Sequence, residues 1–172
     1  MIDLRRYIRD VADFPLPGIL FRDITPLLAD ALAFQCAVEA MCAYVASREV
    51  DVVVAIESRG FLFGAPIADR LGLPFVPVRK PGRLPAERVS VDVTLEYGRG
   101  ALEVHADALR SAARAVVVDD LLATGGTAAG AAHLVELLGG TVVGAVFVVE
   151  LAALGGRAAL APYEVHSLIT YD

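Results

Sequence analysis

The sequence lacks the features that would indicate a secreted, membrane-embedded or nucleic-acid-binding protein. It has 172 residues, no tryptophan, two cysteines and a formal net charge of −6 at pH 7. An acidic balance of this kind offers no basic face for nucleic acid. No apolar run reaches the roughly 18 residues that a membrane-spanning helix needs. The N-terminus has no long apolar segment with a cleavage site, so we expect a cytoplasmic protein.

The two cysteines, Cys36 and Cys42, lie within one helical pattern. Residues at this spacing on a helix point to different faces, so we do not expect a disulfide between them. Two small apolar side chains in a reducing compartment explain these cysteines better than a redox pair does.

The apolar pattern predicts an α/β protein with a mainly parallel, twisted sheet flanked by helices. Continuous apolar runs indicate buried strands, and periodic apolar stripes indicate helices. The expected strands cover residues 52–56, 75–78, 90–95, 101–104, 115–118, 141–149 and 164–169. The expected helices cover residues 2–11, 30–48, 61–71 and 128–138. Pro77 favours either an edge position for its strand or a place at the end of the strand. The lack of a linker or repeat favours a single domain over residues 1–172.

Residues 79–104 form a stretch of less regular sequence, in which basic residues are separated by glycine and proline. Long irregular segments in compact domains are usually functional loops or lids. We therefore expect a flexible lid arm over this range, with two short strands inside it.

The strongest local signal is the run Val-Val-Val-Asp-Asp-Leu-Leu-Ala-Thr-Gly-Gly-Thr over residues 116–127. Its apolar start places the following loop at the carboxyl end of a strand, where open α/β sheets bind ligands. Gly125 and Gly126 let backbone N–H groups approach an anion closely, and Thr124 and Thr127 add hydroxyl donors. A helix that starts here adds unpaired N–H groups and the positive end of its dipole. The run therefore predicts a phosphate cradle.

Asp119 and Asp120 distinguish this cradle from the common nucleotide-binding loops. No Gly-Lys-Ser/Thr follows, which excludes the triphosphate P-loop, and the glycine spacing does not fit the dinucleotide fingerprint. Carboxylates beside a phosphate would repel it unless they accept hydrogen bonds, and ribose hydroxyls can donate them. We therefore predict a site for a ribose 5-phosphate group. The alternative is a plain strand-to-helix turn with aspartates as helix caps.

Residues 116–127 resemble the phosphoribosyl pyrophosphate signature of type I phosphoribosyltransferases. Other segments are similar to the adenine branch of that family, namely residues 14–28, 57–64, 79–85 and 95–98. The resemblance implies the type I fold, with residues 1–30 as a hood segment that binds the base. It also implies a purine-salvage reaction, in which adenine and phosphoribosyl pyrophosphate give AMP and pyrophosphate.

The resemblance assigns the phosphoribosyl group to the cradle and the acidic pair. Asp119 and Asp120 would bind the ribose hydroxyls and lie near C1, where an oxocarbenium-like transition state gathers positive charge. Fixed carboxylates would stabilise that charge more strongly than they stabilise the ground state. The residues implied for the 5-phosphate are Ala123, Thr124, Gly125, Gly126 and Thr127.

Pyrophosphate is a highly charged leaving group, and the resemblance assigns Arg59 to it, with backbone contacts from Ser58 and Gly60. A guanidinium binds phosphate oxygens in a bidentate fork, although a surface ion pair is the alternative reading of Arg59. Mg²⁺ is expected to bridge pyrophosphate and ribose oxygens with few protein ligands. The family's basic stretch is thought to reach the neighbouring site of a homodimer, which points to Arg79, Lys80 and Arg83.

For adenine, the resemblance implies a flat slot in which Phe21 stacks on one face and Leu121 packs on the other. The backbone of Leu20 and Arg22 would bind the edge of the base, and a backbone group left unpaired against guanine would be costly. Plain core packing is the alternative for Phe21.

The lid carries the family's candidate acid/base, Glu96, followed by Tyr97. Closure of the lid would exclude water from the activated sugar, and a solvated charge is the alternative for Glu96. Arg83 replaces the usual lysine, Val93 replaces a frequent tyrosine, and Pro81 follows the basic pair. These departures bear on lid kinetics more than on the type of reaction.

Two other functions stay open at the level of the sequence. One is a phosphoribosyltransferase for another base, such as hypoxanthine or xanthine. The other is a ligand-sensing regulator with the same fold and no chemistry, which usually needs a DNA-binding extension or a basic RNA face. We expect no additional domain in this sequence, and its formal net charge is −6.

Overall fold

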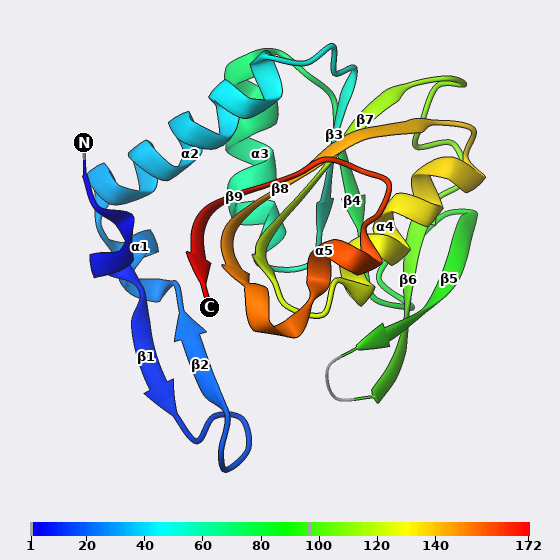
Figure 1. Cartoon of the computed structure of the whole chain (residues 1–172). Helices are drawn as coiled ribbons and strands as arrows, with labels where there is room; N and C mark the ends of the chain where they lie inside the picture. Colours follow the sequence, from blue (N-terminus) through cyan, green and yellow to red (C-terminus); the bar gives the residue numbers. More distant parts are fainter. Residues whose placement is uncertain (1, 96–97) are drawn as a thin grey trace. The chain divides into compact units, whose positions relative to one another are not determined.

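The structure is a computed structural model that describes residues 2–95 and 98–172 (Figure 1). The chain divides into two compact parts, residues 1–40 and 41–172. The single domain expected over residues 1–172 stays a prediction. No helix in the described ranges is long and apolar enough to span a membrane.

The first part contains the 3₁₀ turn η1 (Leu4–Tyr7), the antiparallel hairpin of β1 (Arg9–Ala12) and β2 (Leu20–Asp23), and the short helix α1 (Thr25–Ala29). The helix predicted over residues 2–11 is therefore wrong. Leu4, Ile8 and Val11 fit a helical face, but residues distant in sequence override that local pattern. In the hairpin, the guanidinium of Arg9 donates to Asp23 across the ladder, with Nη2 and Oδ2 2.6 Å apart. The loop predicted over residues 14–18 is confirmed.

The helix predicted over residues 30–48 is confirmed as α2 (Ala31–Ala46). Its first turn is capped by Asp30, whose Oδ1 accepts a hydrogen bond from the Ala33 N–H at 2.9 Å. A side-chain oxygen in this place satisfies one of the donors that a helix start leaves unpaired.

The second part is built on a five-stranded sheet in the order β4-β3-β7-β8-β9, and every neighbouring pair is parallel. Its strands are β3 (Val52–Ile56), β4 (Phe75–Val78), β7 (Arg114–Leu122), β8 (Thr141–Leu151) and β9 (Val165–Tyr171). The predicted parallel sheet is confirmed, as is the edge position of the strand with Pro77. β7 is longer than predicted and includes Asp119 and Asp120.

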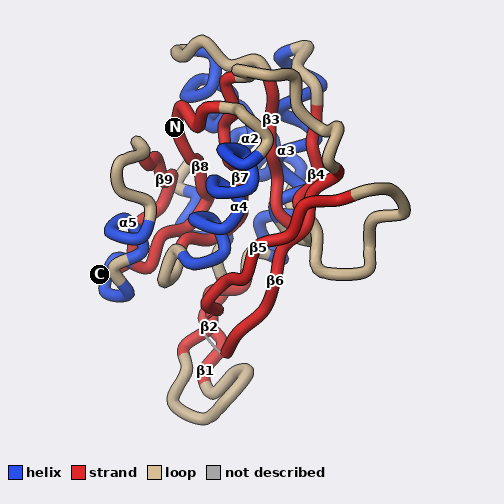
Figure 2. Tube along the Cα trace, turned by 90° about the vertical axis from the view of Figure 1, so that its right-hand side faces the viewer, coloured by secondary structure: helices blue, strands red, loops and turns tan. Residues whose placement is uncertain are grey.

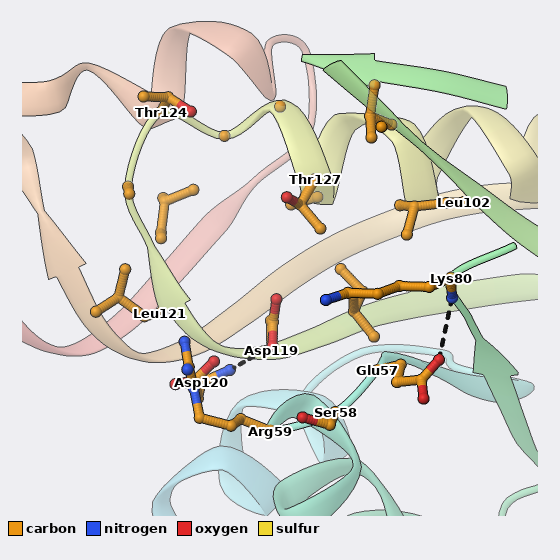
Figure 3. A pocket seen from close by; sticks show the side chains of 18 of the residues that line it. Glu57, Ser58, Arg59, Lys80, Leu102, Asp119, Asp120, Leu121, Thr124 and Thr127 are labelled. Carbon is orange, nitrogen blue, oxygen red and sulfur yellow. Dashed lines mark hydrogen bonds and ion pairs between the residues drawn. The ribbon is translucent and has the colours of Figure 1, made fainter. Parts of the chain in front are cut away.

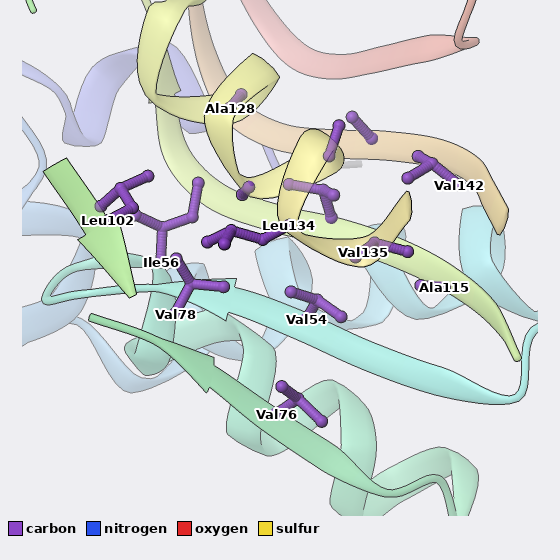
Figure 4. Packing of buried hydrophobic residues seen from close by; sticks show 14 of the residues in the cluster. Val54, Ile56, Val76, Val78, Leu102, Ala115, Ala128, Leu134, Val135 and Val142 are labelled. Atoms are coloured by element: carbon purple, nitrogen blue, oxygen red, sulfur yellow. The ribbon is translucent and has the colours of Figure 1, made fainter. Parts of the chain in front are cut away.

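The helices α3 (Gly60–Leu71) and α4 (Gly126–Leu137) cover opposite faces of this sheet. Val54 and Ile56 belong to the buried cluster that contains Leu134 of α4 (Figure 4). On the other face, a Cβ added to Gly64 of α3 would lie 2.5 Å from the Cβ of Ala55. Alternate residues of β3 therefore point to different helices, as the period of a strand requires.

The two short strands predicted inside the arm, over residues 90–95 and 101–104, are confirmed as β5 (Arg88–Leu95) and β6 (Gly98–His105). Each strand has eight residues, and the two pair as a hairpin that is longer and more regular than predicted. Figure 2 displays the two strands as a long ribbon. Val93 and Leu102 are buried at 5% and 3% exposure. These apolar contacts give the hairpin a side that packs on the body of the second part. After β8, the chain forms the turn η2 (Ala152–Leu154) and the short helix α5 (Gly156–Ala159).

Candidate functional site

A cavity of about 510 Å³ opens at the carboxyl ends of β3 and β7 (Figure 3). This is the edge at which parallel α/β sheets bind ligands. Three segments form its wall: the end of β3 with the following turn, the basic loop with the hairpin, and the end of β7 with the start of α4. Its described lining residues are Ile56 to Arg59, Lys80, Pro81, Val93, Gly100 to Leu102, and Asp119 to Ala128.

The glycine-rich loop closes one end of the cavity, and residues 123–127 all line it. Gly125 has φ +81°, a left-handed conformation that glycine adopts without strain, and α4 begins at the next residue. A Cβ on Gly126 would lie 2.0 Å from the carbonyl oxygen of Thr94 on the hairpin. One glycine is thus required for the turn and the other for the close approach of the hairpin.

The acidic pair, Asp119 and Asp120, lies near the end of β7 and lines the same cavity. Asp119 Oδ1 accepts a hydrogen bond from the backbone N–H of Asp120 at 2.9 Å. Burial, and after it the charge of the Asp120 carboxylate, raises the pKa of the Asp119 carboxyl well above its ordinary range. A Cβ on Gly60 would lie 2.9 Å from Asp119 Oδ1. Gly60 therefore contacts the pair from behind and is not among the described lining residues.

Arg59 is held against the acidic pair. Its Nε donates to Asp120 Oδ2 at 2.6 Å, and the side chains of Arg59 and Asp120 are 48% and 5% exposed. The ion pair considered as an alternative does exist, but it joins Arg59 to a buried carboxylate of the cavity. Ser58 lines the cavity beside it.

The three basic residues of the arm are placed differently from one another. The side chain of Lys80 points into the cavity, while its backbone N–H donates to Glu57 Oε2 at 3.0 Å (Figure 3). Arg79 Nη2 donates to Glu57 Oε1 at 2.8 Å, and its Nη1 donates to the carbonyl oxygen of Arg83 at 3.0 Å. The hydrogen bonds from Arg79 lower the pKa of the Glu57 carboxyl. Neither Arg79 nor Arg83 is among the described lining residues.

The residues assigned to adenine are divided between the two parts of the chain. Leu121 lines the cavity in the second part. Leu20, Phe21 and Arg22 lie on β2 in the first part, where the ring of Phe21 meets the ring of Phe14 edge to face at 5.1 Å. Arg22 pairs with Asp10 across the hairpin.

The residues assigned to acid/base chemistry and lid contact, Glu96 and Tyr97, lie outside the described residues. Val93, at the position of a frequent tyrosine, is buried and forms part of the cavity wall. A Cβ on Gly130 of α4 would lie 2.2 Å from Val93 Cγ1, so the hairpin and the helix fit closely at this point.

Sequence reasoning missed two kinds of residue in this site. Glu57 holds the basic loop, and its place directly after a buried strand was the signal that could have identified it. Leu102 walls the cavity from β6, and this contact depends on tertiary packing that no local motif encodes. In the described ranges, no group of three His, Cys, Asp or Glu side chains is placed to hold a metal ion.

The known proteins that we compared with this chain, and that are similar to it in sequence, share one enzymatic activity. A family model described as the phosphoribosyl transferase domain matches residues 28–168. The adenine phosphoribosyltransferase of Gloeobacter violaceus is 57% identical over 159 residues, which cover 92% of this chain and 93% of the relative. The adenine phosphoribosyltransferase of Caldanaerobacter subterraneus is 52% identical over 169 residues, which cover 98% of each chain.

Solved structures agree with the fold. The crystal structure of adenine phosphoribosyltransferase from Thermoanaerobacter pseudethanolicus matches with a TM-score of 0.95 at 52% identity, and the match covers 98% of both chains. The adenine phosphoribosyltransferase of Saccharomyces cerevisiae, crystallised with an imino-altritol bisphosphate and adenine, matches with a TM-score of 0.91 at 37% identity over 96% of both chains.

Proposed function

Because the chain belongs to the adenine phosphoribosyltransferase family, we propose that it joins adenine to phosphoribosyl pyrophosphate and releases AMP and pyrophosphate. This is a pentosyl transfer of purine salvage. The observation that carries the proposal is one cavity that is lined by both a glycine-rich helix start and two adjacent carboxyl groups. Donors for a phosphate and acceptors for sugar hydroxyls in one cavity suit a phosphate that is joined to a sugar.

In the proposed complex, the loop of residues 123–127 receives the 5-phosphate. Backbone N–H groups at the start of α4 point their donors and the positive end of the helix dipole toward this loop. The hydroxyl groups of Thr124 and Thr127 add donors from side chains that line the cavity. The 5-phosphate stays bonded to the sugar throughout, so its role is to anchor the sugar with C1 near the acidic pair.

The acidic pair would bind the ribose hydroxyls and oppose the charge that develops on the sugar. As pyrophosphate leaves, C1 and the ring oxygen share positive charge, and carboxyl groups fixed in a partly buried site stabilise it. Arg59 keeps the Asp120 carboxyl in place through its 2.6 Å contact. The transition state gains more from this arrangement than the ground state does, which is the condition for rate acceleration.

The pyrophosphate would lie on the opposite side of C1, between Ser58, Arg59 and the side chain of Lys80. Both cations line the cavity, and guanidinium and ammonium groups are suited to phosphate oxygens. Glu57 supports this side by fixing Arg79 and the backbone of Lys80. A homodimer in which the arm residues Arg79, Lys80 and Arg83 reach a neighbouring site stays a prediction from family resemblance.

The residues of the cavity fit a Mg²⁺ ion that enters with its substrate. Asp119 and Asp120 would offer carboxyl oxygens, the type of ligand that Mg²⁺ accepts, and the ion usually keeps several waters and substrate oxygens. When bound, Mg²⁺ would neutralise charge on the leaving pyrophosphate.

For adenine we retain the proposed slot of Phe21, Leu121 and the backbone of Leu20 and Arg22. Glu96 is proposed as the acid/base group and Tyr97 as a lid contact. All six assignments rest on family resemblance, and the yeast relative crystallised with adenine supports a base site in this family. A cytoplasmic location also stays a prediction.

The decisive experiment measures pyrophosphate release with phosphoribosyl pyrophosphate, Mg²⁺ and one base at a time. We expect release with adenine and little with hypoxanthine, guanine or xanthine. Release with an oxopurine would keep the mechanism and overturn the base assignment. Binding of phosphoribosyl pyrophosphate without release for any base would favour the regulator instead.

A further inference from the structure

A single-turn helix lies directly behind the loop that is proposed to hold the 5-phosphate. In Figure 1, α5 lies beside the start of α4. A Cβ on Gly156 would lie 2.3 Å from the carbonyl oxygen of Ala123, and a Cβ on Gly125 would lie 2.5 Å from the carbonyl oxygen of Gly156. The two backbones are therefore in direct contact. The residues of α5, all of them described, lie outside the cavity lining.

An ion pair holds this short helix in place. One helical turn is not stable alone, so its position depends on tertiary contacts. Arg157 Nε and Nη2 donate to Glu150 Oε1 and Oε2, each at 2.7 Å, and Arg157 Nη1 donates to the carbonyl oxygen of Val165 at 2.9 Å. A fork of two parallel hydrogen bonds fixes orientation as well as distance.

The carboxylate of this pair is anchored in the sheet next to the loop. Glu150 is the partner of Leu122 in the β7–β8 ladder, and Leu122 is the last residue of β7 before the loop. The Glu150 side chain is 4% exposed. The hydrogen bonds from Arg157 lower the pKa of the Glu150 carboxyl, so the pair is charged at neutral pH.

We propose that Arg157 and Glu150 are positioning residues for the 5-phosphate: they keep α5 packed behind residues 123–125 and so hold the loop's N–H groups ready for the anion. The inference rests on the proposed function, which assigns the 5-phosphate to this loop. The loop holds the same phosphate before and after transfer, so the pair strengthens binding of substrate and product alike. Pyrophosphate, assigned to Ser58, Arg59 and Lys80, lies beyond its influence.

The test compares two ligands of the full chain in the presence of Mg²⁺: ribose 5-phosphate, which needs the loop, and pyrophosphate, which does not. Arg157→Lys keeps the charge and loses the fork, whereas Glu150→Gln keeps the shape and loses the charge. We expect calorimetry to give at least about a tenfold loss of ribose 5-phosphate affinity in each variant, with pyrophosphate affinity unchanged. In turnover assays, KM for phosphoribosyl pyrophosphate should rise while kcat changes little.

Two further variants make the comparison specific. Gly156→Ala disturbs the same loop and keeps both side chains of the ion pair, because its new Cβ would collide with the Ala123 carbonyl oxygen. This variant should also lose ribose 5-phosphate affinity and keep its pyrophosphate affinity. Arg114→Ala is the matched control, since it removes an arginine that pairs with Glu49 at 2.6 Å at the opposite end of β7. It should leave both affinities unchanged.

Unchanged ribose 5-phosphate binding in Arg157→Lys, Glu150→Gln and Gly156→Ala would overturn the proposal. A parallel loss of both ligands would overturn it too, because that result indicates a general defect of folding rather than a role at the loop. If the unmodified chain binds pyrophosphate but not ribose 5-phosphate, the assignment of the loop fails first, and the positioning role fails with it.

Discussion

Asp119 and Asp120 are adjacent in the sequence, yet their surroundings differ. Asp120 accepts a hydrogen bond from Nε of Arg59 at 2.6 Å, whereas Asp119 accepts one from the backbone N–H of Asp120 at 2.9 Å. The pKa of the Asp119 carboxyl is raised by burial and by the charge of Asp120. Enzymes commonly separate the roles of two carboxyl groups through such differences in environment. The two aspartates therefore call for separate predictions.

The first prediction concerns the charge of Asp120. Asp120→Asn keeps the size of the side chain and removes its negative charge, so turnover should fall by about a hundredfold or more. The fold should persist, which circular dichroism and thermal unfolding would verify. Asp107→Asn, at an exposed position of the second part, is the control and should retain full turnover. Near-normal kcat in Asp120→Asn would refute the role in the transition state.

The second prediction links Asp119 to stability. Its raised pKa means that the folded protein holds this proton to higher pH than the unfolded chain does, so the group makes folding less favourable as pH rises between the two pKa values. Asp119→Asn removes the effect, and its free energy of unfolding should exceed that of the unmodified chain at pH 7 but not at pH 3. Denaturant unfolding at both pH values measures this. An equal difference at both would contradict the assignment.

At the scale of the elements, the local sequence pattern was sufficient to predict those helices and strands whose signal lies within the segment itself. The continuous run Val52–Ile56 and the Gly-Gly helix start at residues 125–126 are examples, because each contains its own signal. The N-terminal hairpin was missed because Arg9 and Asp23 stabilise it from positions far apart in the sequence. The hairpin of the arm was predicted only in part, as two shorter strands, since Val93 depends on packing against α4.

That packing gives the third prediction. A Cβ on Gly130 would lie 2.2 Å from Val93 Cγ1, and valine is too stiff at χ1 to move aside. Overpacking of this kind costs about 1–3 kcal/mol, partly offset by about 1 kcal/mol of better helix propensity. Gly130→Ala should therefore lower the free energy of unfolding and raise KM for phosphoribosyl pyrophosphate, because Val93 walls the cavity.

The control for this prediction is a double-mutant cycle. In a Val93→Ala background the obstructing methyl groups are absent, so the added Gly130→Ala should no longer destabilise the protein. Denaturant unfolding of the four proteins gives the coupling energy. Equal effects of Gly130→Ala in both backgrounds would mean that the hairpin does not limit the space beside α4.

At the scale of the whole molecule, the protein is negatively charged, although its proposed ligands are anions that positive charge would stabilise. The chain carries a net charge of −6, and the proposed substrate is a polyanion. Among the described lining residues, two are cationic, Arg59 and Lys80, and two acidic residues, Glu57 and Asp120, offset them, while Asp119 is a third acidic residue whose pKa is raised. The protein alone therefore does not neutralise phosphoribosyl pyrophosphate, and a divalent cation is the natural source of the missing charge.

The fourth prediction is that turnover depends on Mg²⁺. Removal of divalent cations with EDTA should lower turnover by about a hundredfold or more, since unscreened pyrophosphate would face the acidic side chains of the cavity. Addition of excess Mg²⁺ should restore the rate, and EDTA already saturated with Mg²⁺ is the control for effects of the chelator. Because the ion is expected to bind mainly through substrate oxygens, calorimetry should detect weak Mg²⁺ binding without substrate and tighter binding with it. Full turnover in EDTA would mean that Arg59 and Lys80 suffice for the leaving group, despite the acidic balance around them.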